Sequence, residues 1–151
     1  MGPWFESASG SQTNEAPCGI FNRMALFRYG TECMEIFKEF GIEAAHRLPN
    51  VPADHKCARL HGHSFRIAVY VSGDIDPDLG WVLDFADIGA AFAPIHERLD
   101  HRCLNDVPGL ENPTSENLCV WIWRELTPSL PGLSKIVVRE TCTSGCSYEG
   151  P

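Results

Sequence analysis

Two segments in which apolar and polar side chains alternate constrain the fold most strongly. Residues 34–46 and 61–73 each carry most of their apolar side chains on alternate positions, with Lys38 as an exception, as expected for a β-strand whose side chains point to opposite faces in turn. His46 closes the apolar face of the first segment, while His61 and His63 open that of the second. If the two strands pair antiparallel, the end of one meets the start of the other, and the three imidazoles lie together.

Three imidazoles with an open fourth position form the ligand set of a catalytic zinc site. A single histidine on an apolar face is more often a satisfied core residue, and the His61-Gly-His63 pattern is weak by itself. The same-face placement of all three histidines, with Cys57 four positions before the pair, favours the metal interpretation. We therefore predict that His46, His61 and His63 bind zinc.

The bulk properties exclude several classes of protein. A chain of 151 residues is expected to form one domain with a substantial core. Its net charge of −8 argues against nucleic acid or an anionic membrane as the main partner. No apolar run approaches the ~20 residues of a membrane span, and no secretory signal is recognisable at the start. Seven scattered cysteines favour reduced thiols in a cytoplasm over a disulfide framework.

The first part of the chain differs from the rest. Residues 1–33 have the composition of turns and linkers, which predicts a poorly ordered extension. Translation that starts at Met24 or Met34 would omit most or all of it. Residues 34–151 are expected to form the single folded domain.

Two helices and two further strands are expected after the paired strands. Asp84 is suited to cap a helix that runs to residue 99, within which Pro94 should cause a kink or a break. A second helix should begin near residues 113–115 and end before Pro128. Strands are expected at residues 135–140 and 146–149. The order predicts an α+β fold built on an antiparallel sheet.

Cys57 lies in a polar loop, flanked by Lys56 and Arg59 and close to the expected metal. Nearby cations lower the pKa of a thiol, so Cys57 is a candidate base or nucleophile. The rival role is that of a fourth structural zinc ligand, which would close the site to substrate. Asp100 and His101 follow the first helix and are candidates to orient and activate the thiol, although a polar pair at a helix end is commonly only solvated.

Glu140 continues the apolar face of the strand that carries Ile136 and Val138. A carboxylate there can accept two hydrogen bonds from the amidine-like edge of a purine or pterin. The alternative is a strand-end carboxylate that faces water. Three residues separate Cys142 from Cys146, which is not the spacing of redox or zinc motifs, so we expect them to be structural.

These residues together resemble the 6-pyruvoyl-tetrahydropterin synthase superfamily. The similarity covers residues 34–150, nearly the whole expected domain. Within the superfamily, the short spacing from Cys57 to His61 resembles the carboxy-pterin branch of the queuosine pathway, since the pyruvoyl branch has a longer insertion. The segments that carry the resemblance are Phe40-Gly-Ile-Glu-Ala-Ala-His-Arg-Leu-Pro49, Cys57-Ala-Arg-Leu-His-Gly-His63, Leu99-Asp-His101, Asn112-Pro-Thr-Ser-Glu116 and Glu140-Thr-Cys142.

The resemblance implies the tunnelling fold, or T-fold: a four-stranded antiparallel sheet with two helices on one face. Subunits would join their sheets into a barrel as a homo-oligomer, by family resemblance a hexamer. It also implies one zinc ion per subunit on the three histidines. By the same resemblance, proton transfer would fall to Cys57, Asp100 and His101, and pterin binding to Glu140, with Thr114 and Glu116 near the pterin.

The implied reaction converts 7,8-dihydroneopterin triphosphate and water into 6-carboxy-5,6,7,8-tetrahydropterin, acetaldehyde and triphosphate. Two alternatives stay open at this point. The first is 6-pyruvoyl-tetrahydropterin synthase activity, which uses the same zinc site and substrate without releasing acetaldehyde. The second is a structural zinc-binding module in which Cys57 joins the three histidines.

Overall fold

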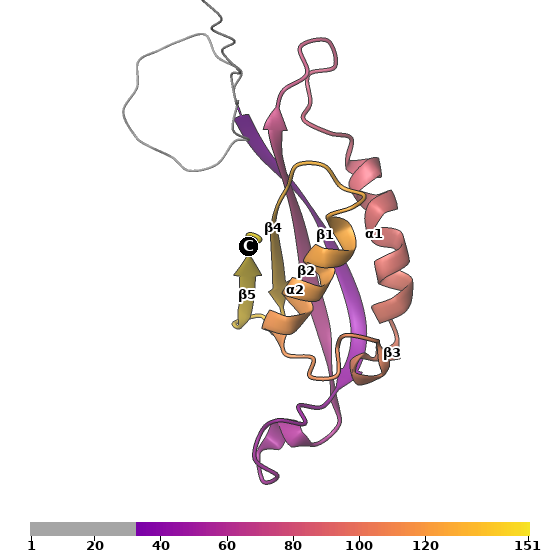
Figure 1. The fold of residues 1–151 in the computed structure, drawn as a ribbon, viewed down its shortest axis with the longest axis vertical. Helices are drawn as coiled ribbons and strands as arrows, with labels where there is room; N and C mark the ends of the chain where they lie inside the picture. The colour runs from indigo at the N-terminus through magenta and orange to yellow at the C-terminus, as the bar shows by residue number, and fades with distance from the viewer. Residues whose placement is uncertain (1–32) are drawn as a thin grey trace, which may run out of the picture.

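The protein is built on one twisted sheet whose longest strands are β1 and β2 (Figure 1). The computed structural model describes residues 33–151, so the expected extension at residues 1–33 lies outside the described part except for Cys33. The strand order is β3-β1-β2-β4-β5. The strands span Cys33–His46 (β1), His61–Asp74 (β2), Arg102–Cys103 (β3), Leu133–Arg139 (β4) and Gly145–Tyr148 (β5).

The sheet has five strands instead of the four that were predicted. The additional strand, β3, pairs in parallel with β1 through Ala44 and Arg102, whereas the other strand pairs are antiparallel. A strand of two residues is too short for its alternation to be recognised in the sequence. The four longer strands lie where the sequence predicted them, which confirms the α+β fold of the T-fold type.

Both long helices cover the same face of the sheet (Figure 1). Helix α1, Phe85–Leu99, begins after the predicted Asp84 cap, and α2, Ser115–Leu126, begins after Thr114. Between helices and sheet lies one apolar core. Its largest fully buried side chains are Phe65, Phe92, Ile42, Ile67, Ile88, Leu99, Leu104, Leu110, Leu118, Ile122, Leu126 and Ile136.

Helix α1 does not break at Pro94 but continues through it to Leu99. A proline inside a helix removes one backbone hydrogen bond, here the one to the carbonyl of Ala90. Pro94 and Ala90 both lie on the exposed side of α1, where water can satisfy that carbonyl. Phe85, the first residue of α1, is 52% exposed and does not join the core.

The other face of the sheet carries no helix and is rich in polar side chains. Lys135 donates to Glu35 at 2.8 Å across the strands, and Phe37 stacks on Tyr70 with ring centroids 5.1 Å apart. Within one subunit the sheet stays open and does not close into a barrel. No helix among residues 33–151 is long and apolar enough to cross a membrane.

The cysteines within the described part of the chain are mostly reduced, as the sequence predicted. Cys57, Cys103, Cys119, Cys142 and Cys146 are free. Cys33, at the start of β1, differs from that expectation because it is disulfide-bonded.

Candidate metal centre and active site

The register of β1 and β2 brings the three histidines together at one end of the sheet. His46 pairs directly with His61, and Ala44 pairs with His63. The ring centroid of His46 lies 4.6 Å from that of His61 and 5.2 Å from that of His63. This confirms the predicted convergence of the imidazoles, while their role as metal ligands stays a prediction.

Backbone carbonyls orient two of the three rings. Nδ1 of His46 lies 2.8 Å from the carbonyl of Pro113, and Nδ1 of His61 lies 2.8 Å from that of Arg59. Because a carbonyl only accepts, each Nδ1 must carry the proton, which leaves Nε2 free with its lone pair. Metal-binding histidines are oriented by such contacts.

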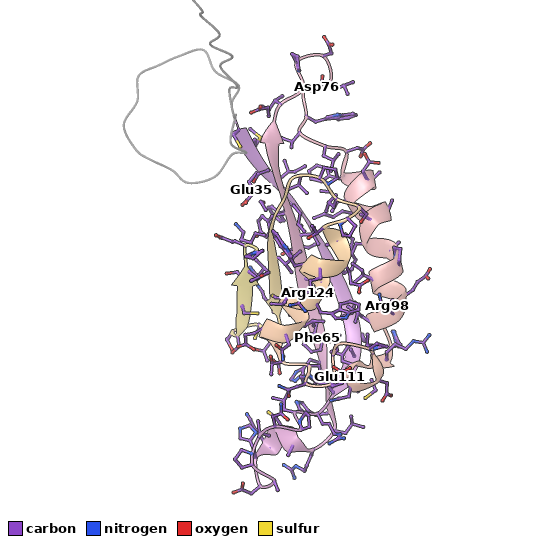
Figure 2. All side chains as sticks on the ribbon, viewed as in Figure 1. Glu35, Phe65, Asp76, Arg98, Glu111 and Arg124 are labelled. Carbon is purple, nitrogen blue, oxygen red and sulfur yellow. The ribbon has the colours of Figure 1, made fainter. Side chains whose placement is uncertain are left out.

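Burial favours the neutral form of His46, which is the form that binds a metal. The residue is 1% exposed, and burial lowers its pKa below the ordinary value. Phe65, labelled in Figure 2, packs edge-on against His46 and His63, with centroids 5.6 and 5.5 Å away. Nε2 of His46 and Nε2 of His63 are buried without a hydrogen-bond partner. Buried nitrogens left unpaired in this way fit a metal ion.

Glu140 follows β4 and brings a carboxylate to the histidines. Its Oε1 lies 2.9 Å from Nε2 of His63 and 3.7 Å from Nε2 of His46. Its Oε2 accepts a hydrogen bond of 2.9 Å from Oγ of Ser115. One ligand atom from each of His46, His61, His63 and Glu140 lies within 4.8 Å of the other three. Nitrogen and oxygen donors of this kind suit zinc.

A cavity of about 640 Å³ opens beside this cluster. Its size is within the range of pockets that bind small molecules. Cys57 lines this cavity, which fits its predicted role as a reactive thiol near a metal. The cationic residues Lys56 and Arg59 also line it. The lining residues are Lys56, Cys57, Arg59, Leu60, His61, His63, Glu140, Thr141 and Ser144.

Asp100 and His101 lie elsewhere, beyond the end of α1. The Asp100 carboxylate accepts hydrogen bonds from the Glu43 backbone N–H at 2.9 Å and from Nδ1 of His101 at 2.8 Å. The Glu43 hydrogen bond, and then the one from His101, hold the pKa of Asp100 below its ordinary value. His101 lies in the left-handed region with φ 56°.

His101 lines a second cavity, of about 540 Å³, which does not include Cys57. Its wall contains Glu43, Ala45, Gly62 and Ser64, which alternate with the buried residues of β1 and β2 and so belong to the helix-free face. His63 is the residue that both cavities share. In one subunit, Cys57 therefore lines the cavity beside the histidines, and His101 lines the other cavity.

The start of α2 contributes Ser115 to the site, which the sequence analysis did not single out. Thr114 caps α2 by accepting a hydrogen bond from the Asn117 N–H, and Glu116 is exposed. Neither residue lines the cavity beside the histidines. Ser115 is 8% exposed and contacts Glu140. A small polar residue on the apolar side of a helix was the available signal.

Comparisons with known proteins agree on one family. The family model described as 6-pyruvoyl tetrahydropterin synthase matches residues 35–151. A 6-carboxy-5,6,7,8-tetrahydropterin synthase of Synechocystis sp. is 47% identical over 77% of this chain and 93% of its own length. The human 6-pyruvoyl tetrahydrobiopterin synthase is 33% identical over 80% of this chain and 95% of its own length. The structure of the Caenorhabditis elegans 6-pyruvoyl tetrahydropterin synthase superposes with a TM-score of 0.74 at 25% identity, covering 83% of this chain and all of that one.

Proposed function

The chain belongs to the 6-pyruvoyl tetrahydropterin synthase family, and on that basis we propose that it is a zinc-dependent 6-carboxy-5,6,7,8-tetrahydropterin synthase. In this proposal it is a lyase that converts 7,8-dihydroneopterin triphosphate and water into the carboxy-pterin, acetaldehyde and triphosphate for queuosine biosynthesis. The observation that carries the proposal is the cluster of three histidines and Glu140 beside a cavity that Cys57 lines.

Each residue of the site suits one task in this reaction. His46, His61 and His63 would hold the zinc ion, which as a Lewis acid stabilises negative charge on side-chain oxygens of a substrate. Cys57 would move a proton of the substrate side chain as a thiolate. Glu140 would accept hydrogen bonds from the amidine edge of the pterin and orient the side chain toward Cys57.

The substrate phosphates need cationic partners on the same cavity. Of the basic residues near the histidines in the sequence, Lys56 and Arg59 line the cavity beside the histidines and Arg47 does not. We therefore place the triphosphate near Lys56 and Arg59. In this proposal Asp100 and His101 of a neighbouring copy would complete proton transfer at Cys57 within a homo-oligomer.

One alternative enzyme and one alternative class compete with this proposal. The human relative supports 6-pyruvoyl-tetrahydropterin synthase activity, at 33% identity against 47% for the Synechocystis carboxy-pterin synthase. A structural zinc module needs a fourth ligand that closes the site. Within the described residues the group close to the histidines is Glu140 and not Cys57, which argues against the Cys57-closed version.

The test is the product of the reaction. Zinc-loaded protein is incubated with 7,8-dihydroneopterin triphosphate, and the products are identified by mass spectrometry with a separate assay for acetaldehyde. The proposal expects 6-carboxytetrahydropterin and acetaldehyde in equal amounts. A 6-pyruvoyl product without acetaldehyde would assign the alternative activity, and absence of turnover by zinc-loaded, folded protein would contradict both enzyme assignments.

A further inference from the structure

We propose that Glu140 is a fourth metal ligand while the cavity is empty, and that a bound pterin draws its carboxylate away from the metal. The inference rests on the proposed function only for its second half. Glu140 would bind first the metal and then the pterin, so the fourth metal position would open only when substrate binds.

Oε1 of Glu140 lies close to Nε2 of both His63 and His46. Oε1 of Glu140 lies 2.9 Å from Nε2 of His63, yet this nitrogen has no hydrogen-bond partner, and neither has Nε2 of His46. A carboxylate so close to an imidazole normally takes a hydrogen bond from it. Here one ligand atom from each of the three histidines and Glu140 lies within 4.8 Å of the others, an arrangement that a shared cation satisfies.

The negative charge of Glu140 also favours a cation at this place. Within residues 33–151 the basic groups within ion-pair distance of Glu140 are the imidazoles of His46 and His63, and no lysine or arginine is among them. The Glu140 side chain is 28% exposed, so its carboxylate is partly removed from water. A partly buried carboxylate is unfavourable unless a cation accompanies it. A divalent cation held by the same imidazoles supplies the missing positive charge.

Ser115 holds the Glu140 carboxylate in position for metal binding. Its hydroxyl, in the first turn of α2, donates to Oε2 and leaves Oε1 toward the histidines. Hydrogen bonds of this kind orient ligating carboxylates at metal sites. Three imidazoles and one carboxylate oxygen complete a four-coordinate zinc shell.

A complete shell would leave no place for substrate oxygen atoms, so Glu140 must be able to leave. The amidine edge of a pterin offers two N–H donors to a carboxylate, which can take them in a bidentate pair. Because Glu140 also lines the cavity, the pterin ring can compete with the metal for it. The metal position would then open only once a pterin is bound.

The first measurement is zinc affinity, by competition with a chromophoric chelator, for the wild type, Glu140→Gln, Ser115→Ala and the matched control Glu116→Gln. Glu116 is exposed on α2 and lies outside the cluster. We expect Glu140→Gln to weaken zinc binding at least ~10-fold, Ser115→Ala to weaken it less, and Glu116→Gln to leave it unchanged. Wild-type affinity in folded Glu140→Gln would overturn the ligand assignment, whatever the enzymatic activity.

The second measurement follows the metal when a pterin binds. Cobalt(II) replaces zinc, and unsubstituted pterin is added, because it has no side-chain hydroxyl that could itself reach the metal. We expect the visible cobalt spectrum of the wild type to change on saturation, and that of Glu140→Gln to stay constant. An unchanged wild-type spectrum with pterin bound would overturn the release step. Neither result depends on whether dihydroneopterin triphosphate is turned over.

Discussion

Cys57 is held differently from the histidines it faces. It is half-buried in the short 3-10 helix at Lys56–Ala58, which His55 caps by accepting a hydrogen bond from the Cys57 N–H at 3.1 Å. Its thiol lines the cavity but is not part of the cluster of four ligand atoms. Metal binding and proton transfer are thereby assigned to separate residues, which mutation can distinguish.

We expect Cys57→Ala to keep its fold and its zinc but to lose turnover about a hundredfold or more, as for removal of a general base. His61→Ala should lose both zinc and turnover, because a ligand is removed. Zinc content by atomic absorption and a product assay, on protein checked by circular dichroism, measure both. Cys142→Ala, an exposed thiol outside the cavity, is the control. Activity retained in metal-free His61→Ala would contradict the metal assignment.

The pH dependence of the metal-free protein should report on His46. Burial makes its pKa lower in the folded than in the unfolded chain, so the unfolded state binds its proton first as the pH falls. The contribution of His46 to stability is therefore complete above the ordinary histidine pKa of ~6.5 and is lost as the pH falls toward the lower folded pKa. Tm of metal-free wild type should fall between pH 7.5 and 5.5, and His46→Asn should show a smaller fall. Parallel curves for the two proteins would contradict this role.

The sequence was sufficient for those site residues whose placement depends on one strand pair. His46, His61 and His63 follow from the alternation of β1 and β2 and from a hairpin-like connection, both of which are local patterns. The contact of Glu140 with the histidines depends instead on β4 pairing with β2 and on α2 packing against β4. Such long-range packing leaves no periodic signal in the sequence. The structure was therefore needed to show that Ser115 donates a hydrogen bond to Glu140.

At the scale of elements, the contact between α2 and β5 contains a pair of thiols. Sγ of Cys119, buried on α2, lies 3.2 Å from Sγ of Cys146 on β5. Burial raises the pKa of both thiols, which keeps them protonated and slow to react at neutral pH. Their proximity nevertheless suits them to form one disulfide between helix and hairpin.

We expect diamide to link Cys119 to Cys146, the azo group taking two hydrogens as the sulfur–sulfur bond forms, and faster at pH 9 than at pH 7. The bond would close a loop of chain, and for loops of this order of length the chain-entropy model gives a stabilisation of ~3 kcal/mol. It should therefore raise Tm by several degrees. Peptide mass spectrometry identifies the link and calorimetry measures Tm. Cys142→Ala should still form it, and Cys119→Ala should not. A Cys142–Cys146 link in the native protein would contradict the prediction.

Two features at the element scale depend on tertiary context. The short strand β3 forms because the chain leaving α1 pairs with β1, where the His101 N–H donates to the Glu43 carbonyl at 2.6 Å. Helix α1 continues through Pro94 because that position faces water. The local sequence alone shows neither the pairing partner nor the exposed side of the helix.

At the scale of the whole molecule, the open sheet and the divided site belong together. Edge strands β3 and β5 end the sheet on either side, and an unprotected edge is a template for pairing with another chain. His101, which is hydrogen-bonded to Asp100, lines the cavity of the helix-free face, whereas Cys57 lines the cavity beside the histidines. Assembly of several copies would both cover the edges and bring His101 of one copy toward Cys57 of another.

A site shared between copies can be tested by mixing two inactive variants. We expect Cys57→Ala and His101→Ala to be inactive alone, because every site in each homo-oligomer lacks one group. Co-expressed with different tags and purified through both, mixed oligomers should regain about one quarter of wild-type activity, since random mixing leaves that share of shared sites intact. Light scattering confirms the oligomer. Mixed oligomers of Cys57→Ala with wild type should retain about half as the control. If that control behaves as expected while the two variants together stay inactive, Cys57 and His101 do not act in one site across a subunit boundary.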